Sequence, residues 1–560
     1  MDVGEMQMKL SQWATEDLAK QFTDLYSLLC NEVWLRVAHH HVNANQGRET
    51  AGIDGETMSN FNGNREGNLE ELRQLLKAGT FEPVPVRRVY VPKPKGGERP
   101  LGIPTIRDRI VQEGLRMILE PLWEADFSVH SYGFRPNRNT YDAISFLGNR
   151  LASYRAESYQ WVIEGDIKSY FDTIPHRRLI KAVKRRVADR KIREIIWKFL
   201  RAGVMYREDF KETLTGTPQG GIVSPLLANI YLHEMDMYME SNDLHLPYHV
   251  REKRRRQGKG NYLYVRYADD WVVLCNGTKA DAQGMQEELG GLLSHMGLTL
   301  SEEKTKLTHL TEGFEFLGYR IIREVGTNGK MVPKVLIPDS AMTKYRHKVR
   351  RALAPNTHKE SVTVKILALN RLTNGWCQYY RVTSSPGRMF SKLSHELFQE
   401  MAHWLGRKFE IRMPEVMRRY RKENTFGINS ARLVRPFEHK AKRLLTKTWH
   451  NPYTAKEATI REQLLVYESI WIGESNRHGR MDLREEVIAR KGTMCAINGP
   501  NCESRGIPLH PSEAVMDHII PRAKFKNPKD ADRMGNLQIL CTNCHRAKTK
   551  TDLKVLSRVR

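Results

Sequence analysis

Two adjacent acids, Asp269 and Asp270, are the residues of this sequence with the most evident chemistry. They interrupt the segment Tyr262 to Cys275, YLYVRYADDWVVLC, in which β-branched and aromatic residues lie on both sides of the break. This pattern predicts a β-hairpin with two carboxylates at its tip. Neighbouring carboxylates repel each other, and Mg²⁺, which prefers oxygen ligands, would relieve that repulsion. By itself the pair also fits an ordinary acidic turn.

A third acid, Asp166, lies far upstream at the end of a short apolar strand within Trp161 to Phe171, WVIEGDIKSYF. Phosphoryl transfer by two metal ions needs acids from separate segments that converge on the ions. We therefore expect Asp166, Asp269 and Asp270 to come together and to bind a pair of Mg²⁺ ions.

A basic hairpin is predicted over Val86 to Pro104, VRRVYVPKPKGGERPLGIP, with Lys93, Lys95 and Arg99 at its tip. These side chains could neutralise the oxygens of a bound triphosphate. A basic hairpin that faces only solvent is the alternative.

A glycine pair, Gly220 and Gly221, precedes a helix that we expect to begin near Ser224 and Pro225. Glycines allow a close approach of the backbone to a ligand, and Gln219 beside them could contact a base or a nucleotide. The alternative is a plain helix-capping turn.

Three further segments give expectations about local structure. Thr15 could cap one helix that continues to about Val42. Leu179 to Phe199 has the periodicity of one amphipathic helix with a basic side that faces solvent or phosphate. The segment 251–260, REKRRRQGKG, has the composition of a flexible basic loop.

Charge and length limit the classes of protein to consider. The 560 residues include 90 Lys and Arg against 65 Asp and Glu, a formal net charge of +25. This excess favours a polyanionic partner, with nucleic acid as the first expectation, and the length predicts several domains. No apolar run approaches a membrane span, and the acidic start is unlike a signal or transit peptide. We expect a cytoplasmic protein with no membrane partner.

Four of the seven cysteines lie in the last 70 residues, which indicates a metal site and not a disulfide framework. Cys541 and Cys544 have the spacing of a zinc half-site, and Cys495 with Cys502 would complete a structural Zn²⁺ site. The first pair departs from the usual spacing, with six residues between its cysteines. Four buried free thiols are the alternative.

The ordered motifs of the chain resemble the fingers and palm of a reverse transcriptase. The stretch from about 47 to 450 resembles a bacterial group II intron-encoded protein, through the blocks RPLGIPTIRDRIVQ, SYGFRP, TPQGGIVSPLLANI and YADD. The resemblance implies a palm in which Asp166 and Asp269 bind two Mg²⁺ ions with Asp270 as the third carboxylate. It also implies that Lys304 is a general acid toward pyrophosphate.

The same resemblance assigns residues to the incoming deoxynucleoside triphosphate. It places Arg87, Lys93 and Arg99 on the triphosphate and Gln219 near the nucleotide. Phe171 matches the position of the steric gate, whose ring would clash with a 2′-OH and so select deoxynucleotides.

The C-terminal segments MDHIIP (516–521), GNLQIL (535–540) and CTNCHRAK (541–548) follow the order of an HNH nuclease. This resemblance implies a ββα-metal fold in which Asp517 and His545 hold one Mg²⁺. His518 would act as general base on water, and Asn536 would fix the loop that aims His518.

Together these inferences predict a multi-domain α+β protein with reverse transcriptase fingers and palm, a helical thumb or maturase domain and a C-terminal ββα-metal domain. We expect an N-terminal helical extension with the start of the fingers at residues 1–85, and the fingers and palm at 86–335. The thumb or maturase domain would follow at 336–450, a linker with the DNA-binding region at 451–485, and the HNH domain at 486–560. No base-reading motif is evident in the DNA-binding region.

The predicted function is that of a multifunctional group II intron-encoded protein. It would be an RNA-directed DNA polymerase, a splicing maturase and a DNA endonuclease in target-primed reverse transcription, with intron RNA and target DNA as partners. One alternative is a splicing cofactor that has lost polymerase activity. Another is a bacterial reverse transcriptase unrelated to introns. The oligomeric state is not evident from the sequence.

Overall fold

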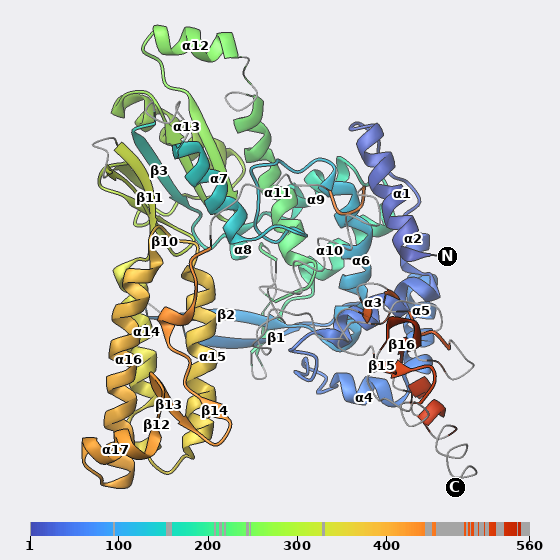
Figure 1. Ribbon diagram of the computed structural model, residues 1–560. Helices are drawn as coiled ribbons and strands as arrows, with labels where there is room; N and C mark the ends of the chain where they lie inside the picture. The colour runs from blue at the N-terminus through green and yellow to red at the C-terminus, as the bar shows by residue number, and fades with distance from the viewer. Residues whose placement is uncertain are drawn as a thin grey trace.

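The computed structural model of the chain mixes helices and sheets throughout (Figure 1). The residues that it describes are 2–92, 96–152, 159–206, 209–211, 215–217, 220–241, 246, 248–326, 331–442, 451–454, 487–488, 491–492, 494–497, 502, 509, 515–521, 531, 533–541, 543–545, 547–549 and 551. Among these residues, no helix combines the length and the apolar character that crossing a membrane requires.

The N-terminal region is helical, and its helices begin at well-defined caps. Its elements are α1 (Val3–Glu16), α2 (Tyr26–Leu29), α3 (Glu32–Ala44), α4 (Met58–Gly63) and α5 (Arg65–Ala78). The Asp2 carboxylate caps α1, and the Asn31 side chain accepts hydrogen bonds from two backbone N–H groups of α3. The prediction of one helix from Thr15 to Val42 is therefore wrong. Thr15 lies near the end of α1, where its hydroxyl donates to the carbonyl of Ser11.

A sheet that we call the hairpin sheet follows, with strand order β2-β1-β4-β5. Its strands are β1 (Val86–Pro92), β2 (Glu98–Ile103), β4 (Val204–Tyr206) and β5 (Asp209–Lys211). β1 and β2 pair antiparallel from Arg87 opposite Ile103 to Pro92 opposite Glu98, which confirms the predicted hairpin.

A second four-stranded sheet, here the central sheet, has the order β6-β7-β3-β8. Its strands are β3 (Trp161–Asp166), β6 (Tyr262–Tyr267), β7 (Asp270–Cys275) and β8 (Lys306–His309). Alternate residues of β7 enter two different cores, because successive side chains of a strand point to opposite faces. Trp271 and Val273 join the core of the N-terminal and central helices, whereas Val272 and Leu274 join a core that continues toward residue 390.

The helices of this middle part of the chain surround the central sheet and extend toward the N-terminal region (Figure 1). They are α6 (Ile106–Glu124), α7 (Thr140–Ala152), α8 (Tyr170–Thr173), α9 (His176–Lys184), α10 (Arg190–Arg201), α11 (Ser224–Met239), α12 (Tyr248–Arg256) and α13 (Lys279–His295). Buried side chains of α6, α11 and α13 share the first of the two cores with Trp271. α11 begins at Ser224 with Pro225 in its first turn, as the sequence predicted.

Two local predictions in this part are wrong. Leu179 to Phe199 forms two helices, α9 and α10, and the Asp189 carboxylate between them caps α10 by accepting from the N–H groups of Lys191 and Ile192. The expected basic loop at 251–260 is largely the helix α12. Arg and Lys are good helix formers, and Glu252 pairs with Arg256 one turn later at 2.7 Å.

A three-stranded sheet of order β11-β10-β9 joins the central sheet to a group of helices that we call the helical arm. The strands are β9 (Phe314–Phe316), β10 (Tyr319–Val325) and β11 (Met331–Leu336). The arm contains α14 (Asp339–Ala352), the 3₁₀ turn Pro355–Thr357, α15 (Val362–Tyr380), α16 (Pro386–Phe409), α17 (Met413–Tyr420), β12 (Arg421–Lys422), β13 (Thr425–Ile428), β14 (Ala431–Arg432) and the 3₁₀ turn Pro436–Glu438. Figure 1 shows α14, α15 and α16 side by side at the lower left, and their apolar faces meet in one core.

The described C-terminal residues form a small antiparallel pair of strands. β15 (Val515–His518) pairs with β16 (Leu537–Leu540), and the 3₁₀ turn Met534–Asn536 leads directly into β16. Cys495, Cys502, Cys541 and Cys544 are buried in the core of this part, together with Leu537 and Ile539.

Candidate functional site

Three carboxylates from two distant segments meet at the end of the central sheet. β3 and β7 are antiparallel neighbours, and Asp166 is the cross-strand partner of Asp270. Asp269 precedes Asp270 in the turn that joins β6 to β7, beside Ala268, whose φ is +58°. The structure thus brings together the three acids that the sequence predicted.

Close backbone packing fixes the turn and the strand that carry these acids. A Cβ atom on Gly165, next to Asp166, would lie 2.0 Å from Cζ2 of Trp271, so the indole ring occupies the space of a side chain there. A Cβ atom on Gly133 would lie 2.4 Å from the backbone nitrogen of Ala268. Only glycine at these two positions lets the segments approach so closely.

A buried ion pair between Arg266 and Asp236 stabilises the β6–β7 turn. Arg266, on β6, donates to both oxygens of Asp236, on α11, at 2.7 and 2.5 Å, and both side chains are fully buried. Burial alone would raise the pKa of Asp236, but Arg266 holds that pKa well below its usual range. The same guanidinium donates to the carbonyl of Ala268 at 3.0 Å, which ties the β6–β7 turn to the pair.

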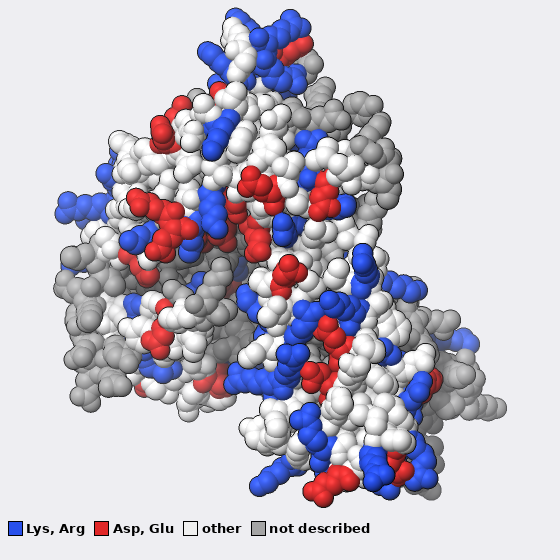
Figure 2. Space-filling model, turned by 90° about the vertical axis from the view of Figure 1, so that its left-hand side faces the viewer, with Lys and Arg blue, Asp and Glu red and all other residues white. Residues whose placement is uncertain are grey.

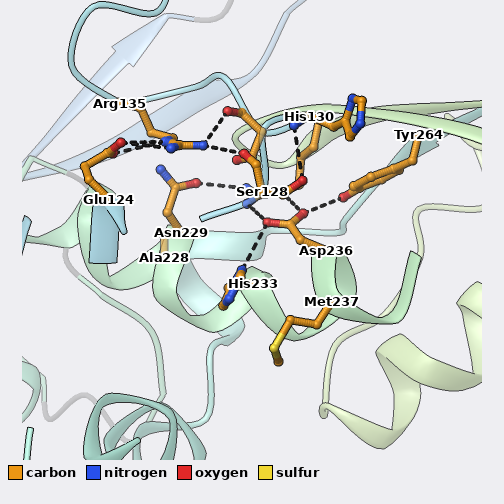
Figure 3. A network of polar contacts seen from close by, with 12 residues as sticks. Glu124, Ser128, His130, Arg135, Ala228, Asn229, His233, Asp236, Met237 and Tyr264 are labelled. Atoms are coloured by element: carbon orange, nitrogen blue, oxygen red, sulfur yellow. Dashed lines mark hydrogen bonds and ion pairs between the residues drawn. The ribbon is translucent and has the colours of Figure 1, made fainter. Parts of the chain in front are cut away.

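The α11 helix contributes several other contacts to this network (Figure 3). Tyr264 donates to Asp236 at 3.1 Å, and His233 lies 3.8 Å from the same carboxylate. Asn229 accepts from Arg266 at 2.8 Å and donates to the carbonyl of Gly133 at 2.8 Å. α11 therefore connects the β6–β7 turn to the segment around Gly133.

A second buried ion pair stabilises the segment around Gly133. The side chains of Arg135 and Glu124 are at most 1% exposed, and the two charged groups lie 2.8 Å apart. Figure 3 shows the two side chains pointing toward each other. Arg135 also donates to the carbonyls of Ser128 and Ser131 at 2.5 and 2.9 Å. The loop from Ser128 to Arg135 is thus folded around one guanidinium.

The acids carry charge that burial and mutual repulsion disfavour. Burial, and then the neighbouring Asp166, raises the pKa of Asp269. Burial, and then repulsion from Asp269 and Asp166, raises the pKa of Asp270 to about 6. A divalent cation would relieve this repulsion, so the donor set fits Mg²⁺.

Lys304 places a positive charge beside the three carboxylates. Its Nζ donates to Oδ2 of Asp166 at 2.7 Å, and this hydrogen bond raises the pKa of the ammonium group. The side chain is two-thirds exposed, at 66%, so it can move away from Asp166. The structure therefore brings the predicted Lys304 to the acids.

A cleft of about 930 Å³ opens beside the carboxylates. Arg99, Asp166, Phe171, Asp269 and Lys304 are among its lining residues, which places five of the predicted site residues around one cavity. Gly220 also lines it, at φ +120°, and a Cβ atom there would meet the carbonyl oxygen of Gly102 at 2.4 Å.

One predicted nucleotide contact, Arg87, is not among the residues that line the cleft. Arg87 is half-buried, and its guanidinium donates to the carbonyl of Ala51 at 3.1 and 2.7 Å. Lys93 and Gln219 lie outside the residues that the structure describes.

Sequence reasoning missed the residues that position the acids, namely Gly133, Asn229, Asp236 and Arg266. One signal for them was present, because Arg266 interrupts the apolar run YLYVRY. An arginine in a buried strand needs an acidic partner, and this requirement points to a buried carboxylate elsewhere in the chain.

A second group of predicted residues meets at the C-terminal strand pair. Nε2 of His545 lies 3.7 Å from Oδ1 of Asp517. The other oxygen of Asp517 accepts from Gln538 at 2.9 Å and lies 3.2 Å from Nζ of Lys548. The carboxylate and the imidazole fit a divalent cation, and His518 follows Asp517 on β15.

Asn536 fixes the chain just after His518. Its side-chain oxygen accepts from the N–H of Ile520 at 2.8 Å. Its amide donates to the carbonyls of Ile520 and Ala531 at 3.1 and 3.0 Å. These bonds bridge three segments around the strand that carries His518.

The four C-terminal cysteines converge. The sulfur atoms of Cys495, Cys502, Cys541 and Cys544 all lie within 4.8 Å of one another, and all four side chains are buried. The Sγ atoms of Cys502 and Cys541 are 3.7 Å apart. A tetrahedral zinc site with Zn–S bonds of about 2.3 Å has sulfur atoms about 3.8 Å apart, so the cluster fits Zn²⁺.

Basic side chains are spread over the face shown in Figure 2, at the top of the view and along its lower part. The last turn of α12 carries Lys253, Arg254, Arg255 and Arg256. On the helical arm, α14 ends with Arg350 and Arg351. Such surfaces favour a nucleic-acid backbone.

Family comparisons divide the chain into three matched parts. The model described as "Reverse transcriptase (RNA-dependent DNA polymerase)" matches residues 91–321. The model "Group II intron, maturase-specific domain" matches residues 342–422, and "HNH endonuclease" matches residues 500–551.

Similar proteins occur in bacteria and in yeast. Protein YkfC of Escherichia coli (strain K12) is 39% identical over 354 residues, which are 60% of this chain and 93% of that protein. The group II intron-encoded protein LtrA of Lactococcus lactis subsp. cremoris is 35% identical over 379 residues, 59% of this chain and 62% of LtrA. An uncharacterized 91 kDa protein in the cob intron of Schizosaccharomyces pombe is 30% identical over 418 residues, 64% of this chain and 51% of that protein. The match thus spans less than two thirds of the last two relatives.

Proposed function

Because the chain belongs to the group II intron-encoded proteins, with reverse transcriptase, maturase and HNH endonuclease domains in that order, we propose that it copies its intron RNA into DNA at a nicked target. The observation that carries this proposal is the pairing of Asp166 with Asp270 beside Asp269. The proposed domain boundaries remain those predicted from the sequence, and a bacterial cytoplasmic location also stays a prediction.

In the polymerase site, Asp166, Asp269 and Asp270 would hold two Mg²⁺ ions. When bound, these ions lower the pKa of the primer 3′-OH and neutralise charge on the leaving pyrophosphate. Because Lys304 shares Asp166 with the cations, we propose that its ammonium group turns toward the pyrophosphate and donates a proton there.

The cleft would hold the incoming deoxynucleoside triphosphate. Arg99 is the predicted triphosphate contact that lines it, and Phe171 and Asp166 line it as well. We propose that the Phe171 ring excludes a 2′-OH and so selects deoxynucleotides. Arg87, Lys93 and Gln219 remain predicted contacts of the nucleotide.

In the nuclease site, Asp517 and His545 would hold one Mg²⁺. When bound, this ion stabilises charge on the scissile phosphate. His518 would take a proton from the attacking water, and Asn536 keeps the adjoining chain in place. The four cysteines would hold a structural Zn²⁺.

We propose that the domains act in sequence on two nucleic acids. The helical arm, with its basic helices, binds the intron RNA and assists splicing, and the RNA then reverse-splices into one DNA strand. The nuclease domain nicks the other strand. The released 3′-OH primes DNA synthesis on the intron RNA in the polymerase cleft.

Primer extension on poly(rA) annealed to oligo(dT) tests the polymerase proposal. We expect dTTP incorporation that Asp269→Ala abolishes and that Asp517→Ala, in the nuclease site, leaves unchanged. Absence of incorporation by the parent protein, or survival of incorporation in Asp269→Ala, would show that the chain is not a polymerase of this kind.

A further inference from the structure

Phe134 has a conformation that packing into a core does not explain. Its φ is +56°, in the left-handed region that is strained for a bulky aromatic residue. The residue is 53% exposed, so burial offsets little of this strain. Such strain persists where the surrounding structure imposes it, and it occurs most often at functional sites.

The surroundings of Phe134 fix its backbone to the turn that carries Asp269. The preceding residue, Gly133, lies against the backbone nitrogen of Ala268 and gives its carbonyl to the amide of Asn229 at 2.8 Å. The following residue, Arg135, is bound in the buried ion pair with Glu124. The contacts of Gly133 and Arg135 therefore fix the backbone on both sides of Phe134.

The ring of Phe134 meets the ring of Phe171 at the cleft. The two ring centroids are 6.2 Å apart with an interplanar angle of 85°, an edge-to-face contact. Both residues line the cleft that also contains Asp166 and Asp269. The backbone of Phe171 is fixed too, because its carbonyl accepts from the N–H of Thr217 at 2.7 Å.

The side chain of Phe171 has fewer restraints than its backbone. It is half-buried, in contact with the main core on one side and open to the cleft on the other. A phenyl ring can block a 2′-OH only while it stays in one rotamer. The edge-to-face contact with Phe134 restrains the ring of Phe171 where it faces the cleft.

We propose that Phe134 is a positioning residue for sugar selection, which keeps the Phe171 ring where it excludes ribonucleotides. The inference rests on the proposed role of Phe171 and adds a residue from a different segment to it. The strained backbone at Phe134 is the geometry that aims its ring at Phe171.

The test measures kcat/KM for dTTP and for UTP on poly(rA)/oligo(dT). Phe134→Gly removes the ring and suits the positive φ, so the variant should keep its thermal midpoint. We expect it to lower the dTTP to UTP ratio by roughly threefold to tenfold, the range for loss of one aromatic pair. Phe134→Tyr keeps a ring and should keep the parent ratio.

The double variant Phe134→Gly/Phe171→Ala shows whether Phe134 acts through Phe171. We expect Phe171→Ala to reduce the ratio more than Phe134→Gly, and the double variant to equal Phe171→Ala alone. The KM for template–primer should be unchanged in Phe134→Gly.

Three results would overturn the inference. An unchanged ratio in Phe134→Gly, or additive losses in the double variant, would show that Phe134 does not position Phe171. Equal losses with dTTP and UTP, with a raised KM for template–primer, would assign Phe134 to stacking on a base. These outcomes leave the polymerase proposal intact, whereas a parent protein that does not incorporate dTTP would end both.

Discussion

Asp166 and Asp270 face each other across β3 and β7, in the last pair of the antiparallel register that begins with Trp161 opposite Cys275. A shift of either strand by one residue would send one of the two carboxylates to the other face of the sheet. The register thus decides whether the acids can share cations. Trp271, lying against Gly165, fixes this register from the core side.

Asp270→Asn should stabilise the metal-free protein at neutral pH. The folded protein raises the pKa of Asp270 to about 6, above its ordinary value near 3.8, so the folded state disfavours the charged form. The free energy that the folded state loses by holding Asp270 ionised grows as pH rises from about 4 to about 6, and it reaches its full value above pH 6. We expect a gain of about 1 kcal/mol at pH 7.5, reduced by solvent screening, that disappears near pH 4.

Thermal unfolding in EDTA between pH 4 and 8 measures this effect. Asp281→Asn is the matched control, because hydrogen bonds from Thr278 outweigh the effect of burial and lower the pKa of Asp281. That variant should lose stability at neutral pH. Equal behaviour of the two variants would contradict the prediction.

Arg266→Met should destabilise the protein strongly, because it leaves Asp236 buried without its cation. Breaking a buried ion pair in this way typically costs about 3–5 kcal/mol. The double variant Arg266→Met/Asp236→Leu should recover much of this loss, since an apolar pair of similar size avoids the buried charge. Urea unfolding measures both.

The exposed pair Arg190 and Glu194 provides the comparison. Their side chains are 84% and 52% exposed, so Arg190→Met should cost well under about 1 kcal/mol.

Even the double variant at Arg266 and Asp236 should polymerise poorly, because the carbonyl of Ala268 loses its donor. Full polymerase activity in that variant would show that the pair does not position the turn.

Asn536→Ala should impair DNA nicking without affecting DNA synthesis. The side chain joins Ile520 to Ala531 beside the strand of His518, and loss of such supporting bonds typically costs about tenfold or more. A nicking assay on duplex target DNA with the protein–RNA complex measures it. Asp269→Ala should keep nicking activity, and a parallel loss of primer extension in Asn536→Ala would argue for general misfolding.

Removal of one cysteine of the cluster should release zinc and unfold only the C-terminal part. Cys544→Ser takes away one of four sulfur ligands, and small domains of this kind depend on their metal for folding. Elemental analysis should find one zinc per parent chain and none in the variant, with dTTP incorporation retained. Cys30→Ser, far from the cluster in sequence, should keep its zinc. Zinc-free parent protein would favour four free thiols.

The sequence predicts local structure well where a short local pattern determines it. The β6–β7 hairpin consists of two β-rich apolar runs around a polar break, and α11 begins at its Ser-Pro signal. The division between α9 and α10 was missed because it depends on a tertiary contact. Asp189 caps α10 and also accepts from the N–H groups of Leu25 and Tyr26, which are distant in sequence.

The acids of the site could be predicted because each follows an apolar strand, whereas their support could not. Asp236 lies inside a helix whose sequence gives no sign that Arg266 is its partner. Gly133 is needed because Ala268 lies against it, a relationship that only the folded chain shows. Composition was misleading at α12, where charge suggested a loop but helix propensity prevailed.

Electron paramagnetic resonance of bound Mn²⁺ tests the central claim most directly, because it counts and distinguishes the metal ions at the three acids. The measurement uses the Asp517→Ala background, which removes the nuclease site, with a template–primer that ends in a dideoxynucleotide, and dTTP. We predict two Mn²⁺ ions per chain with the spectrum of a coupled pair, and loss of that pair in both Asp166→Asn and Asp269→Asn. One isolated ion, or a pair that either substitution leaves intact, would contradict the account.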